Sequence, residues 1–286
     1  MTSPVANLAV SAAPWWVACA FAGAIALAAW RAGSLRADGA VAAFVIGTLA
    51  LRVQWAWGAY LIGWFALATA LSRVGHARKA ARTRDIVSKG NRRDAAQVLA
   101  NGGVFVLAAV IVLLGESTGD RWPRDTMAAL AAIGAAGALA ASGADTWSTE
   151  IGTLVGGEPW SLRSFRRVPP GTSGAVTWNG SLGAVLGALL LSGLAYGVSM
   201  IAAPAVWPVA WGGVAGATVD TLLGALMQER RACPTCGRLT ERLEHCDGTA
   251  TTHVGGIRHL NNDVVNVACS LTGAAVAVVL ATRGIK

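Results

Sequence analysis

The stretch GGVAGATVDTLLGALMQ, residues 212–228, decides the class of this protein. It is apolar except for a stripe of small or polar residues at every fourth position, namely Gly212, Gly216, Asp220, Gly224 and Gln228. This spacing keeps the stripe near one face of a helix. Glycines let a neighbouring helix approach closely, and a carboxylate inside a membrane helix is costly. The stripe therefore predicts one wall of a polar site within a membrane protein.

The composition supports a membrane location, since 54% of the 286 residues are hydrophobic and only 13% are charged. Soluble domains average about 25% charged residues. Apolar runs near the length needed to cross a bilayer, about 17–25 residues, recur along the chain. We place eight, at about 14–30, 38–52, 55–73, 96–114, 125–145, 173–200, 204–227 and 262–281. The sequence thus predicts an all-α, polytopic membrane protein of about eight transmembrane helices, forming a single domain over residues 1–286.

The basic residues indicate the orientation of these helices. Of the 23 Lys and Arg residues, 18 lie at Arg73 or in four loops, at 31–37, 74–95, 146–172 and 228–261. Such loops face the cytoplasm by the positive-inside rule. We therefore expect a bacterial-type inner (cell) membrane protein with both termini outside and a polar site on the cytoplasmic side. The net charge of +8 does not favour nucleic acid as a partner, because the charge flanks membrane helices.

The first motif, KGNRRDAAQVLAN, covers residues 89–101 and enters the fourth predicted helix. Lys89, Arg92 and Arg93 are cations that could hold phosphate groups, with Arg forking onto oxygens and Lys acting as a point charge. Asp94 and Asn101 lie seven residues apart, so they share a helix face. The alternative is that the basic residues only keep this loop inside.

The second motif, GADTWSTEIG, covers residues 143–152 at the end of the fifth predicted helix. Two carboxylates, Asp145 and Glu150, stand there among hydroxyl groups, and Mg²⁺ prefers such hard oxygen ligands. Asp220 lies about eight residues inside the seventh helix, where a carboxylate must be protonated, paired or metal-bound. The alternatives are a solvated helix terminus for Asp145 and a protonated packing role for Asp220.

The third motif, RSFRRVPPGTSG, covers residues 163–174. We expect its Gly-Thr-Ser-Gly turn, which includes Gly171, Thr172 and Ser173, to open the sixth helix. Free N–H groups at a helix start form an anion site. Arg166 and Arg167 precede the turn. Thr172 or Ser173 could equally cap the helix.

The eighth helix begins with NNDVVNVACS, residues 261–270, in which Asn262, Asn266 and Ser270 form another four-spaced stripe. The amide groups could coordinate Mg²⁺, bind a phosphate or a base edge, or bond to a neighbouring helix.

The cytoplasmic loop at 228–261 carries a Cys-x-x-Cys pair followed by adjacent His and Cys residues: Cys233, Cys236, His245 and Cys246. These are zinc-type ligands, and a cytoplasmic position disfavours disulfides. The adjacency of His245 and Cys246 is unlike the usual spaced second pair. A structural Zn²⁺ site and buried thiols therefore both stay open.

Taken together, these motifs resemble the integral-membrane family that contains plant phytyl-phosphate kinase and animal transmembrane protein 19. The resemblance runs from about residue 30 to 280. It is carried by NRRDAAQVLANGG at 91–103, GADTWSTEIG at 143–152, PGTSGAVT at 170–177, the helix of Asp220, and LNNDVVN at 260–266. Ala95, Ala175 and Thr221 are mild departures from the family pattern.

The resemblance implies an isoprenyl (phytyl- or polyprenyl-type) monophosphate kinase that takes a phosphoryl group from a nucleoside triphosphate, with CTP favoured. It implies catalytic roles for Asp94, Asp145, Glu150 and Asp220, and Mg²⁺ ligands among Asp145, Glu150, Asp220 and Asp263. The substrate and phosphate groups would be bound by Lys89, Arg92, Arg93, Asn101, Arg166, Arg167, Gly171, Thr172, Ser173, Gln228, Asn262 and Asn266.

Two other functions stay open. A CTP-dependent cytidylyltransferase making a CDP-lipid would use the same metal and basic loops. A lipid or small-molecule transporter would need polar groups that continue outward, and the outer halves of two helices, 105–114 and 274–281, contain none. The expected partners are an isoprenoid lipid phosphate, a nucleoside triphosphate and membrane lipid. The sequence leaves the oligomeric state open, with a homodimer as one option.

Overall fold

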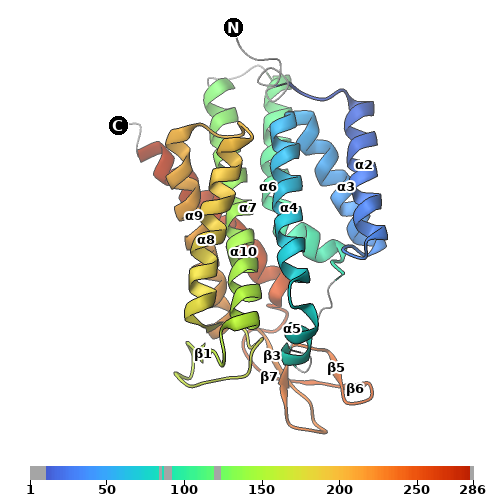
Figure 1. The fold of residues 1–286 in the computed structure, drawn as a ribbon, viewed down its shortest axis with the longest axis vertical. Coiled ribbons are helices and arrows are strands. Elements are labelled where there is room, and N and C mark those ends of the chain that lie inside the picture. The colour runs from blue at the N-terminus through green and yellow to red at the C-terminus, as the bar shows by residue number, and fades with distance from the viewer. Residues whose placement is uncertain (1–10, 84–85, 87–91, 119–123, 284–286) are drawn as a thin grey trace.

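Long helices form the body of the computed structural model, which describes residues 11–83, 86, 92–118 and 124–283 (Figure 1). The helices of this described part are α2 (Trp15–Arg31), α3 (Ala37–Val53), α4 (Trp55–Arg73), α5 (His76–Thr83), α6 (Ala95–Thr118), α7 (Arg124–Val155), α8 (Trp178–Gly197), α9 (Val206–Leu226) and α10 (Asn262–Arg283). A short 3₁₀ helix, Ala203–Ala205, leads into α9. Each of the eight predicted apolar segments coincides with a helix.

Five of these helices are long and apolar enough to cross a membrane, counted over the described residues. Their apolar spans are Ala95–Gly115, Asp125–Val155, Trp178–Gly197, Ala203–Leu226 and Asn262–Arg283. The helix α2 is a shorter apolar helix of 17 residues. The protein is therefore a mostly helical, polytopic membrane protein.

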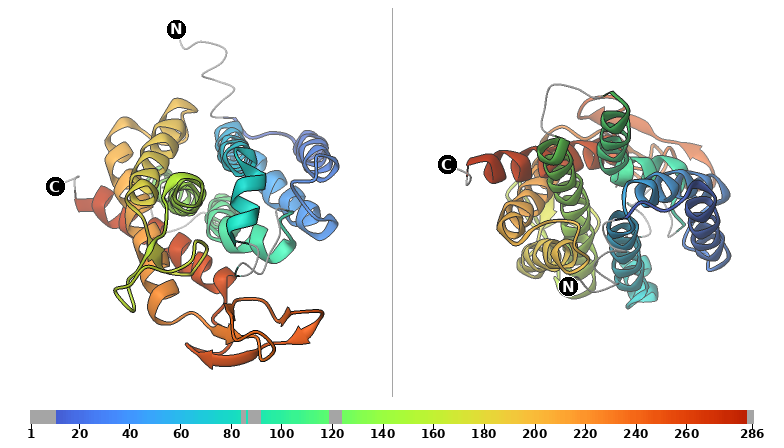
Figure 2. Two further views of the ribbon diagram at one scale, coloured as in Figure 1. Left: turned by 60° about the horizontal axis from the view of Figure 1, so that its bottom comes forward. Right: turned by 90° about the horizontal axis from the view of Figure 1, so that it is seen from above.

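Short strands make the fold less purely helical than the all-α expectation. They are β1 (Trp160–Ser161), β2 (Ala175–Val176), β3 (Arg230–Ala232), β4 (Leu239–Thr240), β5 (Glu244–His245), β6 (Thr249–Ala250) and β7 (Thr252–Gly255). They form three small antiparallel sheets, β1–β2, β4–β3–β7 and β5–β6. All lie in loops at the end of the bundle that also carries α5, which we call the loop end (Figure 1). The segment from β3 to β7 projects from the bundle there (Figure 2).

The helix α7 is central, since it contacts α4, α6, α8, α9 and α10. Its 32 residues correspond to about 48 Å at 1.5 Å per residue, which exceeds a hydrocarbon core of about 30 Å. The fifth predicted segment ended at 145, but α7 continues to Val155. Asp145 and Glu150 therefore lie within a helix rather than at its terminus.

Glycine brings α7, α9 and α10 together at the backbone. A Cβ atom added to Gly137 or to Gly212 would lie 2.5 Å from the carbonyl oxygen of Gly273. That is closer than atoms can approach, so the α7–α10 and α9–α10 crossings require glycine there. The Gly212 end of the predicted stripe therefore packs against a neighbouring helix. The other end of the stripe is not used in this crossing and can line a site.

Candidate functional site

A polar cavity of about 590 Å³ lies at the loop end of the bundle. Its walls come from α4 to α7, from the ends of α8, α9 and α10, and from the loops before α8 and α10. The predicted residues that line it are Arg93, Asn101, Asp145, Glu150, Gly171, Thr172, Ser173, Asp220, Gln228, Asn262 and Asn266. Asp94, Arg92, Arg166, Arg167 and Asp263 are described but are not among the lining residues. Lys89 lies outside the described residues.

Two carboxylates from different helices meet in this cavity. The carboxyl groups of Asp145 in α7 and Asp220 in α9 adjoin within hydrogen-bonding contact. The Oδ2 atom of Asp220 is buried and has no hydrogen-bond partner among the described residues. Two like charges side by side, with one of their oxygens buried, require a proton or a cation between them. The pair is therefore suited to a divalent cation.

Glu150 already has a cation beside it. Lys79 of α5 forms an ion pair with Glu150, and Ser72 Oγ donates to the same carboxylate at 2.6 Å. Lys79 is 7% exposed, and its Nζ also donates to the carbonyl oxygens of Leu71 and Ser72, at 2.9 and 3.0 Å. The structure thus places Glu150 in an ion pair with Lys79, whereas the expected metal-binding group joined it to Asp145 and Asp220.

The helix α5 lies within 74–95, which the sequence analysis describes only as a basic loop. A signal was present, because His76, Lys79 and Thr83 have the three- and four-residue spacing of one helix face. All three line the cavity.

Arg93 lines the cavity just before the start of α6. Its Nη1 donates to Thr69 Oγ1 at 3.0 Å, and its guanidinium stands 5.4 Å from the centre of the Phe65 ring. Burial lowers the pKa of the Arg93 guanidinium, and the charge of Glu150 opposes that shift. A buried guanidinium facing a polar cavity is suited to bind a phosphate or carboxylate oxygen.

Asp94 and Arg92 are used locally in the structure. Asp94 Oδ1 accepts a hydrogen bond from the Gln97 backbone N–H (2.9 Å), and Gln97 Oε1 accepts one from the Asp94 N–H (3.2 Å). This reciprocal pair is a capping box that begins α6. Arg92 donates to the carbonyl oxygen of Leu35 at 3.3 Å. The structure thus supplies a helix-capping role for Asp94 and does not bring it to the aspartate pair.

The asparagine side chains of α6 and α10 have different surroundings. Asn101 donates to the Gln97 carbonyl at 2.8 Å and accepts from Ser142 Oγ at 2.6 Å, which ties α6 to α7. On α10, Asn262 and Asn266 lie in the first turns and line the cavity. Asp263 stands between them in the first turn.

The Gly-Thr-Ser-Gly turn was expected to open a helix, and that expectation is wrong. The helix α8 begins at Trp178, and its cap is Thr177, whose Oγ1 accepts from the Gly180 N–H at 3.0 Å. The turn instead precedes β2. Gly174 has φ +68° and lies directly against the Ala225 backbone of α9, so a side chain there would collide with α9.

The two arginines upstream of that turn are exposed and lie outside the cavity lining. Arg167 stacks on Trp160, with its guanidinium 4.6 Å from the ring centre, and also donates to the carbonyl of Glu158. The backbone of Arg166 accepts from the Ser161 N–H at 2.9 Å. These residues shape the β1–β2 loop.

Glu241 is a cavity residue that the sequence analysis missed. Its Oε1 accepts hydrogen bonds from Ser173 Oγ and from Gln228 Nε2, the latter at 3.0 Å. Burial raises the pKa of Glu241, and these two hydrogen bonds oppose the shift. Its charge also acts on Asp220. Only the course of the β4–β5 loop brings Glu241 here, so no local pattern in the sequence marks it.

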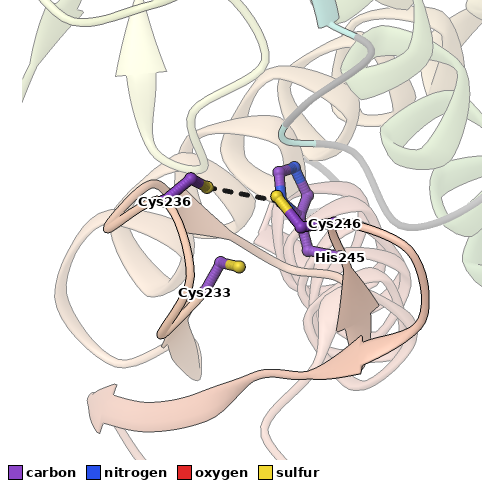
Figure 3. A group of neighbouring side chains, drawn as sticks. All are labelled: Cys233, Cys236, His245 and Cys246. Atoms are coloured by element: carbon purple, nitrogen blue, oxygen red, sulfur yellow. Dashed lines mark hydrogen bonds between the residues drawn. The ribbon is translucent and has the colours of Figure 1, made fainter.

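The four predicted zinc-type ligands do come together (Figure 3). One ligand atom from each of Cys233, Cys236, His245 and Cys246 lies within 4.8 Å of all the others. We call these four residues the Cys/His cluster. It could bind a metal ion such as zinc, which takes such ligands in a tetrahedron.

A second, apolar pocket of about 100 Å³ adjoins the polar cavity. It lies among α2, α3, α4 and α6 and is lined by residues such as Ala43, Ile46 and Phe65. Four residues line both spaces: Arg93, Gln97, Asn101 and Thr146. A polar chamber and an apolar pocket thus share one wall at Arg93.

The fold and the cavity define a polytopic membrane protein with a polar site at one end of its helix bundle. The chain belongs to the family described as Integral membrane protein DUF92, which matches residues 20–274. This confirms the resemblance drawn from the motifs.

Three relatives can be aligned with most of this chain. Protein PGR of Arabidopsis thaliana is 28% identical over 258 residues, 85% of this chain and 87% of that protein. An uncharacterized membrane protein of Methanocaldococcus jannaschii is 34% identical over 197 residues, 69% and 72% of the two chains. Protein VTE6, chloroplastic, of Arabidopsis thaliana is 26% identical over 249 residues, 86% of this chain and 65% of that protein. No solved structure matches this chain.

Proposed function

We propose that this protein is an isoprenyl-monophosphate kinase, which transfers a phosphoryl group from a nucleoside triphosphate to a lipid monophosphate. The observation that carries the proposal is the wall shared by the polar cavity and the apolar pocket at Arg93. That arrangement suits a substrate with an anionic head and an apolar tail. We infer the reaction from the resemblance to the plant phytyl-phosphate kinase of this family. CTP is the favoured phosphoryl donor because of the same resemblance.

Asp145 and Asp220 fit Mg²⁺. Hard carboxylate oxygens are its preferred ligands, and the buried Oδ2 of Asp220, which has no hydrogen-bond partner in the described part of the chain, leaves a coordinating atom available. When bound, the ion would neutralise charge on the donor phosphates. Glu150 is held by Lys79, so we now assign it to positioning α5 rather than to the metal.

The chain's own residues would bind and orient the two reactants. Arg93 would hold the lipid phosphate at the junction of the two spaces, and the amides of Asn262 and Asn266 would contact the donor. A lipid phosphate oxygen attacks the terminal phosphorus of the donor, whose bridging P–O bond breaks and releases the nucleoside diphosphate. The attacking oxygen is already ionised, so no general base is needed.

The cavity favours an enzyme over a transport path. Its lining residues on α7 fall between Asp145 and Thr153, and those on α10 are Asn262 and Asn266, all near the loop end. Beyond them, α7, α9 and α10 approach at the backbone around Gly273. We also infer that eight helices cross the membrane and that the loop end faces the cytoplasm, because the basic loops gather there.

The test is incubation of the purified protein in lipid nanodiscs with phytyl, geranylgeranyl or farnesyl monophosphate, each with CTP or ATP and Mg²⁺. Mass spectrometry should detect the lipid diphosphate together with the nucleoside diphosphate. Asp145→Asn should abolish product, while Asp125→Asn, an exposed aspartate at the opposite end of the same helix, should not. A CDP-lipid with pyrophosphate would instead establish a cytidylyltransferase. Absence of both products with every pair would refute the proposal.

A further inference from the structure

The Cys/His cluster is assembled by two tight turns of the loop end. Cys233 and Cys236 occupy the turn between β3 and β4, where the Gly237 N–H donates to the Cys233 carbonyl at 2.8 Å and Gly237 takes φ +70°. His245 and Cys246 stand at the turn between β5 and β6, where Cys246 itself has φ +40°. Each turn aims two ligands at the same point, as Figure 3 shows.

The distances in the cluster suit a tetrahedral ion. Two thiolate ligands 2.3 Å from a zinc ion, at the tetrahedral angle, lie about 3.8 Å apart. The His245 Nδ1 atom is 3.5 Å from Cys236 Sγ and 3.2 Å from Cys246 Sγ, and all four ligand atoms lie within 4.8 Å. Four protein ligands leave no open position, which is typical of a structural rather than a catalytic site. None of the four lines the polar cavity.

Between the two turns, the chain enters the polar cavity. Glu241 lies five residues after Cys236 and four before His245, and it lines the cavity with Arg242. Its carboxylate accepts from Ser173 of the β1–β2 loop and from Gln228 at the end of α9. The strands on either side are only two residues long, so backbone pairing alone holds this segment weakly.

We propose that the Cys/His cluster binds one Zn²⁺ ion, and that this ion holds Glu241 in the cavity. Zinc closes a loop whose two ends are the two turns, and it restricts the segment between them. Glu241 then bridges Ser173 to Gln228, and so joins the β1–β2 loop to the segment just after α9 in the wall of the cavity. Glu241 is thus a positioning residue for the wall of the cavity. The proposal concerns zinc content and loop order, so its outcome does not depend on which reaction the cavity catalyses.

Elemental analysis of the full-length protein, purified without added metal, tests the first half. We expect about one zinc per chain, lost in Cys236→Ser and retained in Cys19→Ser, which changes a cysteine of α2 far from the cluster. If Cys236→Ser fails to fold, replacement of zinc by Co²⁺ in the wild-type protein decides the matter. Tetrahedral thiolate–imidazole ligation gives intense visible absorption. Protein without stoichiometric zinc, or without these cobalt bands, overturns the proposal.

Hydrogen–deuterium exchange tests the second half. Removal of zinc by a chelator should speed exchange by tenfold or more in the segment 239–245, and also in 169–175, the loop that Glu241 contacts. Residues 40–50 of α3 serve as an internal control and should not change. Glu241→Gln should retain zinc and yet speed exchange in 169–175, because a neutral amide is a weaker acceptor for Ser173. Unchanged exchange in 169–175 after zinc removal would show that the ion does not position Glu241.

Discussion

Lys79 and Glu150 form an ion pair that fastens α5 to α7 at the edge of the polar cavity. The side chain of Lys79 is 8% exposed and that of Glu150 is 21% exposed. The same ammonium group donates to two carbonyl oxygens at the end of α4. One cation thus joins three helices around the site.

Removing only one partner should therefore be costly. Lys79→Met leaves the half-buried Glu150 carboxylate without its cation, and the loss should approach the cost of about 3–5 kcal/mol found when a buried pair is broken. The double variant Lys79→Met/Glu150→Gln should recover much of that loss. Thermal unfolding in detergent, followed by tryptophan fluorescence, measures both, with exposed Arg78→Ala as the control. Equal losses in the single and double variants would contradict the pairing.

The aspartate pair predicts opposite effects on stability and on cation binding. Asp220→Asn removes one of two adjoining carboxylates, so without Mg²⁺ it should relieve their repulsion and raise the unfolding temperature. Mg²⁺ should raise the unfolding temperature of the wild-type protein, and the same change should abolish that rise. Unfolding scans with and without Mg²⁺ measure both effects. An intact Mg²⁺ response in Asp220→Asn would remove this residue from the metal site.

Arg93 should govern affinity for the lipid phosphate. Arg93→Lys keeps the charge but loses the planar donor fork and the stacking on Phe65, so binding of the monophosphate should weaken about tenfold or more. The matched control is Arg92→Lys, next in the chain, whose guanidinium donates to the Leu35 carbonyl and does not line the polar cavity. Titration of a lipid monophosphate into the protein in nanodiscs gives the two affinities. Equal weakening in both variants would point to a general charge effect.

The apolar pocket should select for the tail. Ala43→Phe fills part of that pocket, so it should lower kcat/KM for geranylgeranyl monophosphate by roughly tenfold. Turnover of a five-carbon prenyl monophosphate should fall less, because its tail needs less of the pocket. Val41→Phe, on the exposed side of the same helix, is the control. A uniform loss across all chain lengths in Ala43→Phe would place the tail elsewhere.

Much of this molecule follows from local sequence. The apolar runs predict each long helix because a membrane span needs a long apolar segment. The polar stripes locate Asp220 and Asn266 on faces that meet, and the motif at 143–152 marks Asp145. The capping box of Asp94 and Gln97 was also readable, since it is a four-residue pattern. This pattern explains Asp94 as a helix cap, which is an alternative to its interpretation as a catalytic group.

Other features depend on tertiary contacts that the composition of a segment does not reveal. Lys79 is a buried cation within a strongly polar eight-residue helix, so composition places it in a solvated loop. Glu241 reaches the cavity through a segment with no regular period, and its partners Ser173 and Gln228 come from two other parts of the chain. The role of Glu241 becomes visible only when the tertiary fold is known, whereas the helix-face spacing of His76, Lys79 and Thr83 is already present in the sequence.

The wall shared by the two pockets has a kinetic consequence. A substrate whose head meets Arg93 while its tail stays among α2, α3, α4 and α6 never has to leave the leaflet, and neither does its product. The protein and its lipid substrate then meet by diffusion within the plane of the membrane. The rate should follow the mole fraction of lipid monophosphate in the bilayer, and dilution with inert phospholipid should slow turnover even when the bulk amount of substrate is unchanged.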